Sequence, residues 1–214
     1  MENFREKSFW LSTAPYEPSA PLTGEISVDV AVIGGGFTGL STALHLREAG
    51  QHEVAVLESE VVGFGASGRN AGFGMTLFGL TLSVTKWRFG AEKATEAHHY
   101  MERAVDYLGE IVERYGIDCE YERPGFLRVA TSPAYVKRIQ HEIALAKSLG
   151  IEGIEWLTAP EVAERVKSPS YLGAWWEPRC ALINPAKLAW GLKRAGEAKG
   201  VKFYEGTPVG AIER

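Results

Sequence analysis

Residues 28–39 of the chain read VDVAVIGGGFTG, an apolar run of mostly β-branched side chains that leads into four glycines within six positions. The run Val28–Ile33 predicts a buried parallel strand, because strands covered on both faces are continuously apolar. Apolar residues at helical spacing then predict a helix over residues 40–49, which Gly50 ends. Val54–Leu57 predicts a second buried strand. Residues 28–58 therefore form a βαβ unit.

The glycine spacing Gly34-x-Gly36-x-x-Gly39 falls between the predicted strand and the predicted helix. In that context the first glycine permits a tight turn, the second lets the main chain approach a pyrophosphate, and the third lets the helix pack closely on the strand. Glu58 ends the next strand and can accept hydrogen bonds from a ribose 2′-hydroxyl. We therefore expect a dinucleotide with its pyrophosphate at the positive end of the helix dipole.

A second glycine-rich segment favours FAD over NAD as that dinucleotide. Residues 61–82 hold six glycines and show neither helical nor strand periodicity. Small residues suit a chain that wraps a long cofactor closely. Ser67 and Asn70 offer polar groups there, and Arg69 offers donors for a phosphate or a flavin carbonyl. An NAD-dependent dehydrogenase remains the weaker alternative, since it predicts a further βα repeat soon after Glu58.

Composition excludes several other classes of protein. The 214 residues are 45% hydrophobic and 23% charged, the proportions of an ordinary globular chain. A net charge of −4 without a basic run argues against nucleic acid as a partner. No apolar stretch approaches the ~20 residues of a membrane span, and no secretory signal is visible, so we expect a cytoplasmic chain. Cys119 and Cys180 predict reduced thiols, and we expect no metal site.

The remaining sequence predicts an N-terminal leader and a second set of elements. Residues 11–25 are rich in Pro, Ser and Thr and predict an extended leader. Helical or strand patterns follow, with Asn184 as the N-cap of the last helix. The predicted helices cover residues 90–115, 133–149 and 184–198, and the predicted strands cover 126–130, 201–204 and 209–212.

Four segments together resemble the D-amino-acid-oxidase-like FAD-dependent oxidoreductases, most closely their γ-glutamylputrescine oxidoreductase branch. These segments are SFWLSTAPYEP, VDVAVIGGGFTGLSTALHLREAG, VAVLESEVVGFGASGRNAGFG and INPAKLAWGLKRAGEAKGVKFYEGTPVGAI. The resemblance implies an α/β fold, in which a Rossmann-like FAD-binding domain is interleaved with an α+β substrate domain. The implied boundaries are an extended leader over 1–27, the FAD-binding domain over 28–85 and 183–214, and the substrate domain over 86–182.

The resemblance also implies a set of cofactor-binding residues. Val209 is expected to bind adenine through its backbone. The segment 68–71 contains no histidine, to which some relatives attach the flavin, so we expect non-covalent FAD. The full implied set is Gly34, Gly36, Phe37, Thr38, Gly39, Glu58, Ser59, Ala66, Ser67, Arg69, Asn70, Ala71, Gly72 and Val209.

The implied reaction is oxidation of the C–N bond of an amine or amino acid to an imine, by hydride transfer to the flavin. No catalytic acid or base can be named from the residues. Members of the family continue well beyond Arg214, so both domains are expected to be incomplete there. The missing C-terminal half or a second polypeptide would complete them. The alternative is a truncated, non-catalytic flavin-binding module.

Overall fold

The computed structural model describes residues 3–51, 53–77 and 79–213, which form two compact units. The first unit comprises Met1–Gly72, Ile111–Tyr121 and Ile183–Arg214, and the second comprises Phe73–Glu110 and Glu122–Leu182. The chain thus leaves and re-enters each unit. These boundaries differ from the predicted ones, because residues 73–85 lie in the second unit and residues 111–121 lie in the first. The α/β fold class is confirmed.

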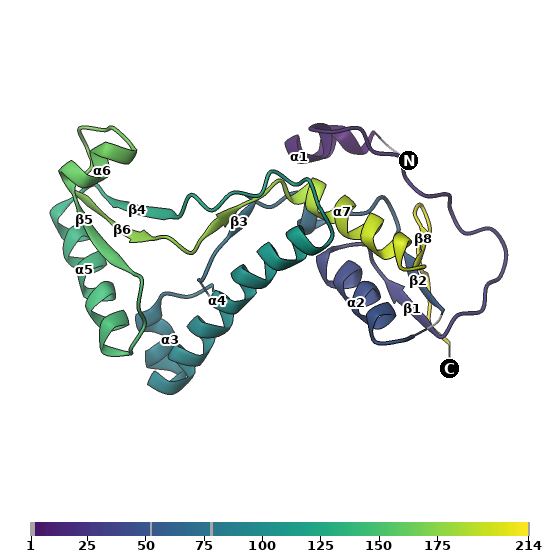
Figure 1. The fold of residues 1–214 in the computed structure, drawn as a ribbon, viewed down its shortest axis with the longest axis horizontal. Coiled ribbons are helices and arrows are strands. Elements are labelled where there is room, and N and C mark those ends of the chain that lie inside the picture. Colours follow the sequence, from purple (N-terminus) through teal and green to yellow (C-terminus); the bar gives the residue numbers. More distant parts are fainter. Residues whose placement is uncertain (1–2, 52, 78, 214) are drawn as a thin grey trace. The chain divides into compact units, whose positions relative to one another are not determined.

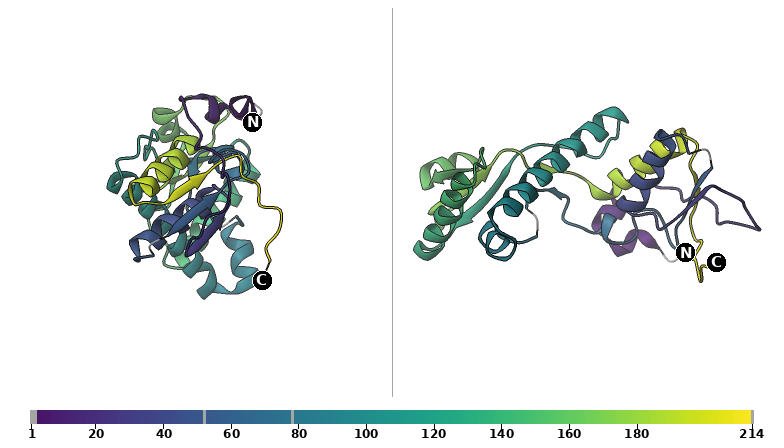
Figure 2. Two further views of the ribbon diagram at one scale, coloured as in Figure 1. Left: turned by 90° about the vertical axis from the view of Figure 1, so that its right-hand side faces the viewer. Right: turned by 90° about the horizontal axis from the view of Figure 1, so that it is seen from below.

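A parallel sheet forms the centre of the first unit. Its strands are β1 (Val30–Ile33), β2 (Val54–Leu57) and β8 (Lys202–Tyr204), in the order β1-β2-β8. Val30 pairs with Val54, and Val56 pairs with Phe203. The three strands lie side by side in every view (Figures 1 and 2). This is the predicted βαβ unit, extended by a strand from near the end of the chain.

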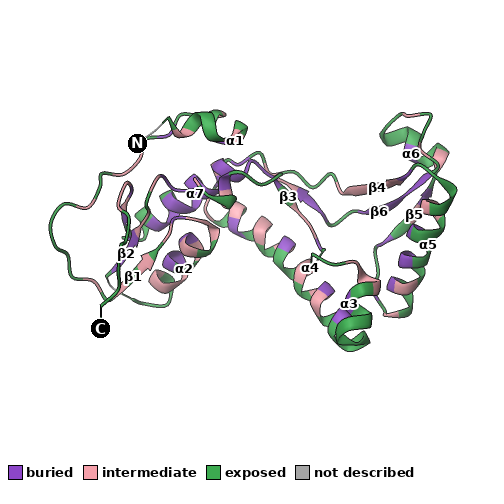
Figure 3. Ribbon diagram, turned by 180° about the vertical axis from the view of Figure 1, so that it is seen from behind, coloured by how far each residue is buried: buried purple, intermediate pink, exposed green. Residues whose placement is uncertain are grey.

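Two helices pack on the sheet of the first unit. Helix α2 (Phe37–Glu48) connects β1 to β2 and buries Leu40, Ala43 and Leu44. Helix α7 (Pro185–Ala198) packs against α2 and is buried over most of its length, as Figure 3 shows. Asn184 is its N-cap, as predicted, because its side chain accepts a hydrogen bond of 3.2 Å from the Lys187 N–H. The core of this unit therefore lies between α2, α7 and the sheet.

Two predictions for this unit are wrong. The leader is not extended throughout, because it contains a 3₁₀ helix (η1, Phe4–Lys7) and α1 (Phe9–Ser12). Ser8 caps α1, and burial of Leu11 holds the helix on the unit. Residues 209–212 form no strand with any described residue, and Val209 and Ile212 are exposed. A β-branched pattern becomes a strand only where a neighbouring strand supplies hydrogen bonds.

Antiparallel sheets and four helices make up the second unit. Strands β4 (Phe126–Ala130), β5 (Glu155–Thr158) and β6 (Gly173–Glu177) pair in the order β4-β6-β5. Two short strands, β3 (Phe73–Gly74) and β7 (Ala181–Leu182), form a separate pair. The helices are α3 (Leu82–Phe89), α4 (Ala91–Arg114, whose last turn belongs to the first unit), α5 (Pro133–Ser148) and α6 (Ala159–Arg165).

The second unit has its own core between α5 and the β4-β6-β5 sheet. Ile139, Ile143 and Ala146 of α5 pack with Trp175 of β6 in one buried cluster. Helix α3 was missed in the sequence, where glycines dominate the segment before it. Its start carries the usual signal, because the Thr81 side chain accepts a hydrogen bond of 3.4 Å from the Val84 N–H.

Both cysteines are free and buried, as expected for reduced thiols. Burial, with a smaller contribution from the nearby Asp118 carboxylate, raises the pKa of Cys119 to about 11. Burial also raises the pKa of Cys180. Both side chains therefore stay protonated at neutral pH and are poor nucleophiles. Among residues 3–51, 53–77 and 79–213, no helix combines the length and the apolar character needed to cross a membrane.

Candidate dinucleotide site

The turn between β1 and α2 has the backbone geometry that its glycines predict. Gly34 adopts a φ of +98°, a conformation that side chains disfavour, and its N–H donates to the Leu57 carbonyl at 2.9 Å. A Cβ atom on Gly39 would lie 2.0 Å from the Gly34 carbonyl oxygen. Gly39 is thus the position at which the helix touches the turn. The Gly34–Gly39 segment, here called the glycine turn, brings α2 against the end of β1.

The first turn of α2 presents main-chain N–H groups. Gly36 is the N-cap and has no side chain to accept hydrogen bonds from them. The Phe37 N–H donates to the Ser67 Oγ at 2.9 Å, and Thr38 next to it is exposed. Such a helix end attracts anions through its N–H groups and its dipole. This end of α2 is therefore suited to a diphosphate.

Glu58, at the carboxyl end of β2, reaches back to the glycine turn. Its Oε2 accepts the Gly35 N–H at 2.6 Å, and its Oε1 accepts the Glu60 N–H at 2.9 Å. The Ser59 Oγ donates to the same carboxylate at 3.2 Å. A carboxylate offers about four acceptor positions. Beside these three donors from the described residues, Glu58 can still accept a hydrogen bond from a ribose hydroxyl.

The segment Gly63–Gly72, here called the glycine loop, lies against the glycine turn. The Gly63 N–H donates to the Gly35 carbonyl at 3.0 Å, and a Cβ atom on Gly68 would lie 2.2 Å from the Gly63 carbonyl oxygen. The short 3₁₀ helix η2 (Ala66–Gly68) places Ser67 beside Phe37. The structure thus brings together the two glycine-rich segments that the sequence singled out.

Asn70 has a local structural role in the glycine loop. Its Nδ2 donates to the carbonyls of Ala66 at 3.3 Å and Ser67 at 2.9 Å, and its Oδ1 accepts the Gly72 N–H at 2.8 Å. These bonds close the loop on itself and occupy both ends of the amide. The Asn70 side chain therefore stabilises the conformation of the glycine loop.

Arg69 is the one cation in the sequence of the glycine loop. Its side chain is exposed, and its guanidinium carbon lies 4.3 Å from the centre of the Phe64 ring. Stacking on an aromatic face leaves the edge of a guanidinium available for hydrogen bonds. Arg69 is therefore placed to bind an anionic or carbonyl oxygen. Ala71 beside it is exposed.

The predicted adenine-binding segment is tied to Glu58. The Thr207 N–H donates to the Glu58 carbonyl at 2.8 Å, and the Gly206 N–H donates to the Glu60 carbonyl at 2.8 Å. Val209 follows two residues later and is 37% exposed. These hydrogen bonds hold the segment that precedes Val209 against Glu58, the predicted ribose-binding residue, although the predicted strand does not form.

Two groups of residues around this site were missed in the sequence. The side chains of Ser8 and Trp10 donate to the glycine loop. The second group is the ion pair between Lys193 and the fully buried Glu205. The Glu205 Oε1 accepts a hydrogen bond of 2.6 Å from the N–H of Val62, the residue before the glycine loop. An N-cap serine before an apolar run was a usable signal for the first group. The second group had no signal in the local pattern.

These features define a dinucleotide-binding α/β protein. The helix end can hold a diphosphate, Glu58 can hold a ribose, and glycines stand where the main chain must come close. Glycine at positions 39 and 68 is what lets these segments pack so closely, because a Cβ atom there would overlap main-chain oxygens. The residues present therefore fit a cofactor of the predicted type.

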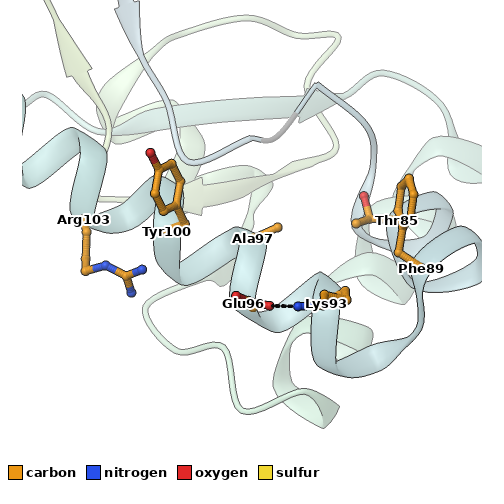
Figure 4. A pocket seen from close by; sticks show the side chains of 7 residues that line it. All are labelled: Thr85, Phe89, Lys93, Glu96, Ala97, Tyr100 and Arg103. Atoms are coloured by element: carbon orange, nitrogen blue, oxygen red, sulfur yellow. Dashed lines mark hydrogen bonds and ion pairs between the residues drawn. The ribbon is translucent and has the colours of Figure 1, made fainter. Parts of the chain in front are cut away.

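A groove in the second unit shares none of the predicted site residues (Figure 4). It measures about 410 Å³ and lies between α3 and the first half of α4. Lys93 and Glu96 form an ion pair of 2.6 Å at its wall. The groove is lined by Thr85, Phe89, Lys93, Glu96, Ala97, Tyr100 and Arg103.

Comparison with known proteins identifies the family. The family of FAD dependent oxidoreductases named DAO matches residues 29–214. The chain belongs to this family, whose cofactor is FAD. The sequence prediction of an FAD-dependent, D-amino-acid-oxidase-like chain is thereby confirmed.

Individual relatives agree with the family. The chain is 35% identical over 207 residues to γ-glutamylputrescine oxidoreductase of Escherichia coli K12, covering 96% of this chain and 48% of the relative. It is 31% identical over 187 residues to glycine oxidase of Bacillus licheniformis, covering 86% and 47%. The crystal structure of glycine oxidase from Bacillus cereus superimposes with a TM-score of 0.71 at 26% identity, covering 88% and 50%. The chain spans about half the length of these relatives.

Exchange of Glu58 for glutamine is expected to weaken FAD binding about tenfold or more. The glutamine amide either places its NH₂ donor against the Gly35 N–H or accepts that N–H with a neutral oxygen. In both cases the charge-assisted hydrogen bonds of the carboxylate are lost, and such bonds typically contribute about 1.5–3 kcal/mol. Equilibrium titration with FAD, followed by flavin fluorescence, measures the change. The exposed Glu25→Gln serves as the matched control. Equal dissociation constants for the two variants would contradict a role for Glu58.

Proposed function

We propose that this protein is an FAD-dependent oxidoreductase that oxidises the C–N bond of a small amine or amino acid to an imine. One observation carries the proposal. The glycine turn, Glu58 and the glycine loop form one hydrogen-bonded cluster, through the Gly35–Glu58 and Phe37–Ser67 bonds. The names of the relatives, an oxidoreductase of an acylated polyamine and an oxidase of glycine, support an amine or amino acid as the substrate class.

In this proposal the residues of the chain hold and orient the cofactor. The first turn of α2 binds the diphosphate, Glu58 binds the ribose of the adenosine, and the segment around Val209 binds adenine through its backbone. Arg69 lies nearest the flavin and binds one of its oxygens, and Ser59, Ala66 and Ala71 contribute to the wall of the site. FAD, when bound, accepts the hydride from the C–H bond beside the substrate nitrogen. The FAD is held without a covalent bond.

The second unit is proposed to supply part of the substrate domain. Its antiparallel sheet β4-β6-β5 and helix α5 form a separate core, as an independent domain requires. We also propose that the protein is located in the cytoplasm, as the sequence predicts. No residue of the chain is assigned as an acid or base, since the cofactor carries the chemistry in this class of reaction.

The reaction is tested with the full-length protein loaded with FAD. Anaerobic mixing with a panel of putrescine derivatives, sarcosine, glycine and D-amino acids should bleach the oxidised flavin absorption for at least one amine. The matching aldehyde or keto acid should accumulate in step with flavin reduction. Reduction by NADH and by no member of the panel would contradict amine oxidation. It would favour a nicotinamide-dependent activity instead.

A further inference from the structure

The N-terminal segment Ser8–Leu22, here called the strap, contacts the glycine loop directly. The Ser8 Oγ donates to the Gly68 carbonyl at 2.9 Å, and the Trp10 Nε1 donates to the Asn70 carbonyl at 2.7 Å. The two acceptors are the carbonyls on either side of Arg69. The strap therefore bonds the peptide group that precedes Arg69 and the peptide group that follows Asn70, on either side of the one cation of the loop.

Apolar packing accompanies these two hydrogen bonds. Leu11, the residue after Trp10, is fully buried. A Cβ atom on Gly68 would lie 3.1 Å from the Leu11 Cδ2. The glycine at position 68 thus allows the strap to approach as well as the loop to turn. Ser8 also accepts the Trp10 N–H at 3.2 Å, so the cap of α1 aligns both donors.

The rest of the strap is anchored to buried groups of the same unit. The Asn184 Nδ2 donates to the Thr13 Oγ1 at 2.8 Å. The Tyr16 hydroxyl and the Ser19 N–H donate to the Glu205 carboxylate at 2.7 and 2.6 Å. Burial and the Glu205 charge raise the pKa of Tyr16, which keeps its hydroxyl a donor. Because the strap is fixed at Thr13, Tyr16 and Ser19, its hydrogen bonds to the glycine loop restrict the motion of that loop.

The strap precedes the residues that are matched to the family as a whole. The family match begins at residue 29, after the strap ends. The strap nevertheless bonds to the glycine loop, which lies within the matched residues.

We propose that Ser8 and Trp10 are positioning residues for Arg69, and that through Arg69 the strap sets how tightly the protein holds FAD. This inference rests on the proposed FAD site. Removal of both donors frees the peptide groups beside Arg69 while the charge itself remains. The guanidinium then samples more orientations, and its bond to the cofactor is formed at a greater loss of conformational entropy.

The test compares a strap variant with a matched control in the full chain. Ser8→Ala combined with Trp10→Phe removes both donors and keeps the indole-sized packing largely in place. Ser12→Ala removes a hydrogen bond of 2.7 Å from the same helix, to the Phe9 carbonyl, without touching the loop. The strap variant should raise the FAD dissociation constant about tenfold, because the Arg69 side chain then loses more conformational freedom when FAD binds. Ser12→Ala should leave it unchanged within about twofold.

A cycle with Arg69→Ala separates positioning from general destabilisation. In that background the strap variant should weaken FAD binding by less than about twofold, because its effect passes through the missing side chain. A full tenfold loss in the Arg69→Ala background would overturn the inference. Equal FAD affinities of the wild type and the strap variant would overturn it as well.

Hydrogen exchange on the cofactor-free protein gives a readout that does not depend on FAD. Amides of the glycine loop should exchange faster in the strap variant, while those in the middle of α2 keep their wild-type rates. Unchanged loop exchange would overturn the role of the strap even where FAD binds. If the glycine-loop amides exchange more slowly in the wild type than in the strap variant but the wild type binds no FAD, the proposed function fails and the role of the strap stands.

Discussion

Alanine at position 39 is expected to destabilise the first unit by about 3 kcal/mol and to abolish measurable FAD binding. The added Cβ atom would lie 2.0 Å from the Gly34 carbonyl oxygen and 3.3 Å from the Val32 Cγ1. Both contacts belong to β1 and the turn, so α2 must move away from the sheet. Overpacking of this kind costs about 1–3 kcal/mol, and more where backbone cannot yield.

Two other glycine variants separate folding from cofactor approach. Gly210→Ala places its Cβ atom in open space and should change the free energy of unfolding by less than about 0.5 kcal/mol. Gly36→Ala meets only the Ser67 side chain, at 3.0 and 4.0 Å, and should leave most of the stability intact. It should still weaken FAD binding, because the side chain enters the diphosphate position. Denaturant unfolding and FAD titration of the three variants test this order, and a stable Gly39→Ala protein that binds FAD would contradict it.

Lys193→Met is expected to destabilise the first unit by about 3–5 kcal/mol. The Lys193 Nζ lies 2.6 Å from the Glu205 Oε2 and 3.0 Å from the Tyr16 hydroxyl. The two charged side chains are 5% and 0% exposed. Removal of one partner of such a pair leaves an uncompensated buried charge, which accounts for the large cost. The Glu205 carboxylate would retain three neutral donors, from Tyr16, Val62 and Ser19.

A surface ion pair provides the control for this prediction. Lys202 and Glu53 lie at the same distance, 2.6 Å, but their side chains are 51% and 50% exposed. Lys202→Met should therefore cost less than about 1 kcal/mol. The double variant Lys193→Met with Glu205→Gln should recover part of the loss, because no buried charge remains. Denaturant unfolding measures all three, and equal losses for Lys193→Met and Lys202→Met would show that burial of the pair contributes nothing.

The buried pair also contacts two segments beside the candidate cofactor site. Through Val62 it holds the chain between Glu58 and the glycine loop, and through Tyr16 and Ser19 it holds the strap. We therefore expect Lys193→Met to lower FAD affinity as well as stability. An FAD titration measures the affinity, and denaturant unfolding of the same preparation measures the stability.

Local chemistry explains why the backbone geometry of the candidate site could be predicted from the sequence. The glycine turn and the N-cap of α7 follow from the backbone demands of residues a few positions apart. Glu58 lies at a strand end that the apolar pattern marks. The signals for the glycine turn and Glu58 lie within one βαβ unit, and the N-cap signal lies directly before α7.

The strap and the buried ion pair could not be predicted in the same way, because their partners lie far away in the sequence. Trp10 bonds a residue 60 positions later, and Tyr16 bonds a residue 189 positions later. A Pro-rich composition describes the leader but says nothing of what it packs against. Lys193 follows Trp190 on an amphipathic helix, where a lysine ordinarily predicts the solvent face. The strand predicted over 209–212 failed for a related reason, since strand pairing is also non-local.

The central claim is that the glycine turn, Glu58 and the glycine loop hold FAD. It is tested most directly by titrating the cofactor-free protein with FAD and, separately, with NAD⁺, and by recording the visible spectrum after removal of excess ligand. We expect saturable retention of FAD with flavin absorption bands, no comparable binding of NAD⁺, and release of all flavin on denaturation. A protein that stays colourless after incubation with FAD, or that binds NAD⁺ in its place, would contradict it.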